Sequence, residues 1–115
     1  MKTLSVIGLF SAMALVPAIA GAQGTDADPT YAREVSRIIQ DNCQICHQPG
    51  QIGPMSLTTY EEIRPWAPLI REKVLGREMP PYQYDHDIGI QELKGDWRMD
   101  QEDIDTMVAW VDAGS

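Results

Sequence analysis

The stretch NCQICHQPG, residues 42–50, contains both cysteines of the 115-residue chain, three positions apart and followed at once by a histidine. Three kinds of chemistry use two cysteines this close together: a dithiol–disulfide redox pair, part of a zinc site, and covalent attachment of haem. The rest of the sequence has to distinguish among these three.

The sequence pattern Cys-x-x-Cys-His is the attachment motif of c-type haem. Two thiols about one helical turn apart can form thioethers with both vinyl groups of a porphyrin, and the next residue then lies beneath the iron. The motif therefore predicts one covalently attached haem c per chain, held by Cys43 and Cys46, with His47 as the proximal ligand of the iron.

The alternatives account for fewer of these residues. A structural zinc site needs four protein ligands, and only His86 and carboxylates remain after the motif. A thioredoxin-type dithiol normally follows a strand and begins a helix, and the sequence shows no such context. A structural disulfide would close a very short loop, which contributes little loop-closure entropy, and it would leave His47 without a role. All three alternatives stay open.

The first 22 residues have the layout of a secretory signal peptide. Lys2 precedes an apolar run from Leu4 to Val16, and small residues follow in two Ala-x-Ala patterns that end at Ala22. The run is shorter than the roughly 20 residues that span a bilayer as a helix. We expect cleavage after Ala22, export to the periplasm and no membrane insertion of the mature chain. The alternative is an uncleaved N-terminal anchor.

The composition is acidic, with 17 Asp and Glu against 9 Lys and Arg and a formal net charge of −8. Signal cleavage would also remove Lys2. A surface of this charge repels nucleic acid and anionic lipid, and it favours a partner protein with a basic patch. Residues 23–29 are small and polar and are predicted to form a flexible leader, and residues 30–115 to form one domain.

No segment alternates between apolar and polar residues as a strand does, so the predicted fold class is all-α. A first helix is expected to begin with Asp28 as its cap and Pro29 as its first residue, and to lead into the cysteine motif. Its apolar face consists of Tyr31, Val35, Ile38 and Ile39.

Two further helical regions are predicted after the Pro- and Gly-rich loop that follows the motif. The first begins at a capping box of Thr59 and Glu62, breaks near Arg64, and continues to Leu75. Gly76 ends it, and its apolar face consists of Ile63, Trp66, Leu69, Ile70 and Val74. After an irregular segment, 77–97, a last helix is expected between a cap at Asp100 and Gly114. Its apolar face consists of Ile104, Met107, Val108 and Val111.

Met79 is the preferred sixth ligand of the predicted haem iron. It follows the helix stop at Gly76, and two prolines after it restrict the backbone. Ligation by His and Met raises the reduction potential relative to two histidines. Met55 and Met99 are alternative ligands, because both lie beside turn-like sequence. Met107 is expected to fill the core, and His86 to be a solvated surface residue.

Residues 31–114 resemble a class I c-type cytochrome domain. More narrowly, they resemble a group of bacterial monohaem domains marked by a Met-Pro-Pro-aromatic segment, here Met79 to Tyr82. Tyr82 stands where tryptophan is commoner in the group. Members of the group stand alone, or lie beside or are fused to periplasmic oxidoreductases such as quinoprotein dehydrogenases and copper monooxygenases. The resemblance implies that residues 30–115 form a small helical cytochrome c domain wrapped around one haem.

Carried over to this chain, the family pattern makes Cys43 and Cys46 the thioether sites, His47 the proximal ligand and Met79 the distal ligand. Related proteins have a proline whose carbonyl steadies the proximal imidazole, and Pro49 lies just after the histidine here. Trp110 matches an aromatic residue of the last helix that packs against the first helix. The chain is expected to be a monomer or a domain of a larger protein, since it stops directly after the last helix.

The predicted function is a periplasmic one-electron carrier rather than an enzyme. The expected haem-pocket residues are Ile52, Met55, Leu57, Trp66, Leu69 and Met107. The main alternative is a haem enzyme or gas sensor with an open sixth position, in which Tyr82, Tyr84 or His86 acts on the bound ligand. A haem-free interaction module is the third possibility. The sequence does not identify the electron donor or acceptor.

Overall fold

The computed structural model of the protein describes residues 27–82, 84–85 and 87–115. The predicted signal peptide, residues 23–26 of the predicted leader, and His86 lie outside the described residues. The described part of the chain contains helices and no strands, which confirms the all-α class at that level. None of its helices is long and apolar enough to cross a membrane.

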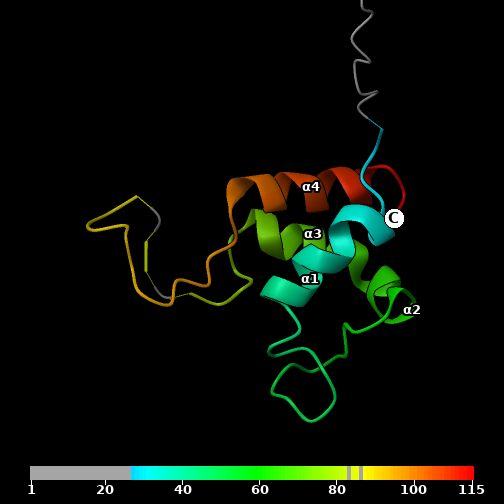
Figure 1. Cartoon of the computed structure of the whole chain (residues 1–115), viewed down its shortest axis with the longest axis horizontal. Coiled ribbons are helices and arrows are strands. Elements are labelled where there is room, and N and C mark those ends of the chain that lie inside the picture. The colour runs from blue at the N-terminus through cyan, green and yellow to red at the C-terminus, as the bar shows by residue number, and fades with distance from the viewer. Residues whose placement is uncertain (1–26, 83, 86) are drawn as a thin grey trace, which may run out of the picture.

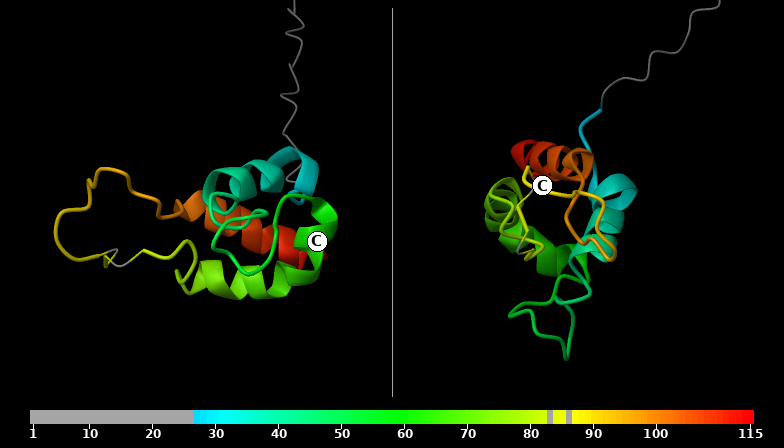
Figure 2. Two further views of the ribbon diagram at one scale, coloured as in Figure 1. Left: turned by 90° about the horizontal axis from the view of Figure 1, so that it is seen from below. Right: turned by 90° about the vertical axis from the view of Figure 1, so that its left-hand side faces the viewer.

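The helices pack side by side as a small bundle. A π-helical turn, η1 (Tyr31–Val35), continues as α1 (Ser36–Asn42). The next elements are α2 (Tyr60–Ile63), the 3-10 turn η2 (Arg64–Trp66), α3 (Ala67–Leu75) and α4 (Gln101–Asp112). The long loops between α1 and α2 and between α3 and α4 leave this helical body in different directions (Figure 1). Seen along the bundle, the first helix, α3 and α4 surround a common centre (Figure 2).

The core at this centre takes apolar side chains from every helix. Its buried members are Val35, Ile38, Ile39, Leu57, Ile63, Ala67, Ile70, Val74, Met99, Ile104, Met107 and Trp110. At one end of the bundle the Tyr31 ring lies 5.2 Å from the Tyr60 ring and 6.4 Å from the Trp110 ring, measured between centroids. Trp110 therefore packs against the first helix, as the resemblance implies, and Met107 fills the core as predicted.

The start of the first helix differs from the prediction, because Thr30 and not Asp28 is the cap. The Thr30 hydroxyl accepts a hydrogen bond from the Arg33 N–H at 3.3 Å, and the Glu34 carboxylate accepts one from the Thr30 N–H at 2.8 Å. This reciprocal pair satisfies N–H groups that a helix start leaves without partners, which favours a start at Tyr31.

The apolar face predicted for the middle helices is wrong at two positions. Trp66 and Leu69 are 41% and 38% exposed, whereas Ala67 is fully buried. The cause is η2, which winds more tightly than an α-helix and so changes which side chains face the core on entering α3. The prolines that flank Trp66 and Ala67 led to a predicted break, but not to this rotation.

The predicted helix ends are largely confirmed. Thr59 and Glu62 form the predicted capping box, and Gly76 is the C-cap of α3. The left-handed backbone lies one residue later, at Arg77 with φ 51°, and not at Gly76 with φ −74°. Asp100 is the N-cap residue of α4, although its side chain makes no capping hydrogen bond.

The Glu62 carboxylate does more than close the capping box. One of its oxygens accepts hydrogen bonds from the Thr58 hydroxyl at 2.7 Å, the Ser56 hydroxyl at 2.8 Å and the Thr58 N–H at 3.0 Å. The Thr59 N–H donates to the same oxygen at 3.2 Å. These donors favour the charged form and lower the pKa of Glu62 from 4.5 to about 2, with the Thr58 hydroxyl as the largest cause.

We therefore expect acid to weaken the fold partly through Glu62. A carboxyl whose pKa is lower in the folded state stabilises the fold fully above its ordinary pKa of 4.5, and this contribution disappears as the pH falls toward about 2. Glu62→Gln should be less stable than the native chain at pH 6, and the difference should shrink between pH 4.5 and 2. Urea unfolding at several pH values measures it. Glu61→Gln, on the same helical turn, is the control and should show no such convergence.

Candidate functional site

The cysteine motif continues directly from α1 as one more turn. The Cys43 N–H donates to the Ile39 carbonyl at 2.9 Å. The Cys43 carbonyl in turn accepts from the N–H groups of Cys46 at 3.1 Å and His47 at 2.9 Å. Both thiols are free, so no disulfide joins them. The structure therefore brings two unbonded thiols and an imidazole together in one turn at the end of a helix.

The orientation of the His47 ring is set by a backbone carbonyl. The Nδ1 atom lies 3.1 Å from the carbonyl oxygen of Met55. A carbonyl can only accept a hydrogen bond, so Nδ1 carries the proton and donates it. In this tautomer the Nε2 lone pair is available to a metal, and a histidine that ligates a metal commonly has its other nitrogen engaged in this way.

The resemblance implied that Pro49 supplies this carbonyl, and the structure assigns it to Met55 instead. Pro49 is exposed. After it, the chain reverses through Gly50, whose φ is 84°, and the Gln51 N–H donates to the Gln48 carbonyl. The reversal brings the residues beyond the turn back to the imidazole, so a carbonyl eight positions after the histidine reaches it.

Gly53 allows this close return, and the sequence analysis did not single it out. Its N–H donates to the Cys46 carbonyl at 2.7 Å. A Cβ atom added at Gly53 would lie 2.6 Å from His47 Nδ1 and 2.6 Å from the Cys46 carbonyl oxygen, too close for either atom. The Gly53-Pro54 pair marked a turn in the sequence, but the approach to the histidine depends on tertiary structure.

Leu57 holds the far end of the same loop. Its N–H donates to the His47 carbonyl at 2.9 Å, and its own carbonyl accepts from the Gln44 side-chain amide at 3.0 Å. Its side chain is 3% exposed and belongs to the core. The loop from His47 to Leu57 is thus closed on the motif by hydrogen bonds and joined to the bundle by the buried Leu57 side chain, with Met55 packed beside it.

The surroundings of the Cys43 thiol differ from those of a reactive dithiol cysteine. Burial raises the pKa of the Cys43 thiol to about 12, so this group is neutral at physiological pH. Dithiol oxidoreductases react through a cysteine whose pKa is lowered. The environment of Cys43 has the opposite effect, which counts against the redox-dithiol alternative.

Met79 lies at the start of the other long loop. Its N–H donates to the Lys73 carbonyl at 3.3 Å, near the end of α3, and the bond to Pro80 is cis. Its side chain is 41% exposed, whereas Met99 and Met107 are 5% and 0% exposed and belong to the core. Met55 is half-buried against that core.

The predicted haem-pocket residues other than the half-buried Met55 divide into two groups. Leu57 and Met107 are buried in the core, and Met107 is fully enclosed by protein. Ile52, Trp66 and Leu69 are exposed, with Ile52 at 88%. Ile45, between the two cysteines, is also 60% exposed. Large apolar side chains thus lie on the surface on both sides of His47 in the sequence.

The described residues add no further metal-binding cluster to the motif. In the described ranges, no three His, Cys, Asp or Glu side chains lie close enough together to hold a metal ion. The Tyr82 ring packs against the Tyr84 ring at 5.4 Å and lies under the guanidinium of Arg98, also at 5.4 Å. His86, the third polar residue of the gas-sensor alternative, is outside the described residues.

Comparison with protein-family models, with curated proteins and with solved structures finds no match to this chain. The fold and the site define the chain as a small helical domain whose first helix ends in a Cys-x-x-Cys-His turn. The histidine of this turn is oriented by a returning loop.

We expect Gly53→Ala to disturb this site. The added methyl group would force apart His47 and the Cys46 carbonyl, at a cost of about 1 to 3 kcal/mol in the free energy of unfolding. Denaturant unfolding measures the loss, and the NMR signals of the His47 ring should shift.

Gly76→Ala is the matched control, because Gly76 has a negative φ and its nearest neighbour is the flexible Glu78 side chain at 3.2 Å. The change there should stay within about 1 kcal/mol. Equal effects of the two substitutions would contradict the close contact at Gly53.

Proposed function

We propose that the protein is a periplasmic c-type cytochrome that carries one electron between redox partners. Haem c would be attached through Cys43 and Cys46, with His47 as proximal and Met79 as distal ligand. The observation that carries the proposal is the His47 imidazole, which follows two free thiols in one turn and has its Nδ1 engaged by the Met55 carbonyl.

The residues present fit this cofactor. Two thiols and an imidazole are the donors that c-type attachment requires, and the exposed Met79 would supply a thioether as the second ligand of the iron. The side chains of Ile45, Ile52 and Trp66 are exposed, and any of them that borders the cofactor would gain from being covered. Covering them with a porphyrin would remove apolar area from water, which is favourable by about 25 cal/mol for each Å².

Each part of the site has a separate task in this proposal. The cysteines hold the cofactor, the Met55 carbonyl orients the proximal imidazole, and Gly53 leaves room for the loop that carries this carbonyl. Met79 closes the sixth position to small molecules. Haem c, when bound, supplies a one-electron couple at its iron. No base or nucleophile is needed, so the protein is proposed to be an electron carrier and not an enzyme.

The proposed partners and location follow from the charge and the N-terminus. The formal net charge of −8 favours brief docking to periplasmic redox proteins with a basic patch. A quinoprotein dehydrogenase is one such candidate. The signal-peptide layout of residues 1–22 supports export to the periplasm.

Covalent haem attachment is tested by the mass of the exported protein. Produced in a host with cytochrome maturation machinery, the native chain should be heavier than its polypeptide by one haem, and the haem should stay with the protein band on a denaturing gel. Replacing both cysteines, Cys43→Ser with Cys46→Ser, should abolish this, because no other cysteine remains. A bare polypeptide mass for the native chain would refute the proposal.

Ligation by Met79 has its own test, the weak sulfur-to-iron absorption band of the oxidised protein. Met79→Leu keeps the approximate volume but removes the sulfur, so the band should disappear and the reduced protein should bind CO readily. Met55→Leu and Met99→Leu are the matched controls and should retain the band. A native protein with a high-spin spectrum and rapid CO binding would favour the gas-sensor or haem-enzyme alternative.

A further inference from the structure

We propose that Arg98 is a positioning residue for the distal methionine: it holds the segment Met79–Tyr82 in place from the returning side of the long loop. This inference deepens the proposed function, since it concerns how Met79 is kept where it can ligate. Arg98 lies 19 positions beyond Met79 in the sequence, and no motif in the sequence analysis pointed to it.

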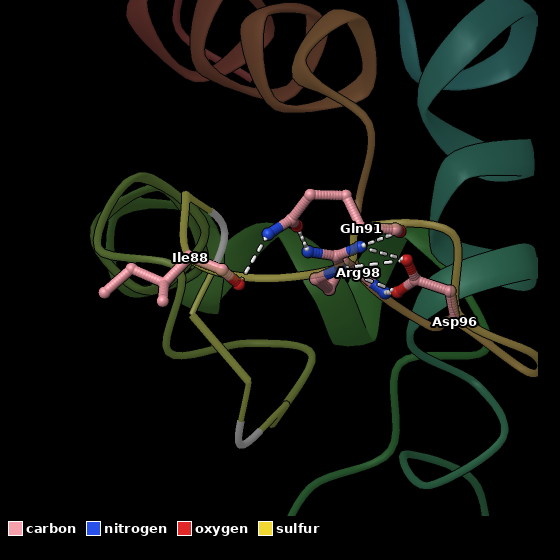
Figure 3. Close-up of polar contacts among 4 residues, drawn as sticks. All are labelled: Ile88, Gln91, Asp96 and Arg98. Carbon is pink, nitrogen blue, oxygen red and sulfur yellow. Dashed lines mark hydrogen bonds and ion pairs between the residues drawn. The ribbon is translucent and has the colours of Figure 1, made fainter.

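The Arg98 side chain is unusually enclosed for its position. It is 11% exposed, although most of its neighbours in the loop are exposed. Its guanidinium donates to the Gln91 carbonyl at 3.0 Å, to the Gln91 side-chain oxygen at 2.7 Å and to the Asp96 carboxylate at 2.9 Å (Figure 3). The Gln91 amide donates in turn to the Ile88 carbonyl at 2.8 Å. The Arg98 side chain thus joins Gln91 to Asp96, and the Gln91 side chain extends these contacts to Ile88.

The same guanidinium also contacts the outgoing side of the loop. It lies 5.4 Å from the centre of the Tyr82 ring, a distance at which a cation is attracted to the ring face. Arg98 lines a small cavity together with Met79 and Pro80. Arg98 is therefore placed between the returning loop and the residues that follow directly on the proposed ligand.

Both ends of this arrangement are anchored to the helical body. Met99, next to Arg98, is 5% exposed and belongs to the core, and α4 begins two residues later. On the other side, the Met79 N–H is bonded to the Lys73 carbonyl, and an ion pair of 2.8 Å joins Lys73 to Glu78. The Met79–Tyr82 segment is thus held at its start by α3 and at its end by Arg98.

Removing Arg98 should therefore loosen one end of this segment and leave the other in place. A ligand position needs a side chain that is held by its surroundings, because lost order disfavours the ligated state. Because the contact of the Arg98 guanidinium with the Tyr82 ring is a cation–π attraction, its loss should shift the equilibrium by up to about tenfold toward a free sixth position. The protein would then bind small molecules that the native protein excludes.

The test compares Arg98→Gln with Arg71→Gln in the exported, haem-loaded protein. Arg71 is a matched control, because it also pairs with a carboxylate, that of Asp112 at 2.8 Å, but joins α3 to α4 away from the loop. Arg98→Gln should weaken the sulfur-to-iron band and raise the rate of CO binding to the reduced protein by about tenfold. Arg71→Gln should leave both unchanged, and Arg98→Lys, which keeps the cation, should restore part of the native behaviour.

A second readout does not depend on ligation. With methyl-labelled methionine, NMR relaxation reports the order of the Met79 methyl group, which should fall in Arg98→Gln and in Asp96→Asn but not in Arg71→Gln. Unchanged Met79 order in Arg98→Gln, or equal changes in Arg71→Gln, would overturn the inference. A native protein without the sulfur-to-iron band, but with Met79 order that still depends on Arg98, would refute the proposed ligation while supporting the positioning role.

Discussion

The loop that carries His47 is joined to the helical core by Leu57, its one buried residue. Its N–H bonds the His47 carbonyl, its carbonyl accepts from Gln44, and its side chain is buried among the helices. Because these three interactions belong to a single residue, the cysteine turn and the core cannot move independently. The position of the Met55 carbonyl, and through it the His47 tautomer, follows from this closure.

The molecule divides into a helical body and two long loops that carry the proposed ligands. The body buries its apolar residues between the first helix, α3 and α4. The loops carry His47 and Met79, and each returns to the body through one buried side chain, Leu57 in the first and Met99 in the second. Functional groups on loops that are positioned by a rigid scaffold are common in proteins.

Much of this arrangement could be predicted from the sequence. Local sequence patterns, which relate residues three or four positions apart, predict the helices. They also predict the Thr59–Glu62 capping box and the core position of Met107. The exposure of Trp66 could not be predicted from the sequence, because it depends on how η2 joins α2 to α3. Nor could the role of the Met55 carbonyl or the enclosure of Arg98, since both require loops to fold back, and the residues concerned carry no local pattern.

The hydrogen bonds to Glu62 also affect the candidate site, because their donors lie in the loop that returns to His47. Ser56 and Thr58, which donate to this carboxylate, flank Leu57, and Ser56 directly follows Met55. Protonation of Glu62 would therefore weaken both the cap of α2 and the loop segment whose Met55 carbonyl orients the His47 ring. We therefore expect the stability of the fold in acid and the orientation of the His47 ring to change together.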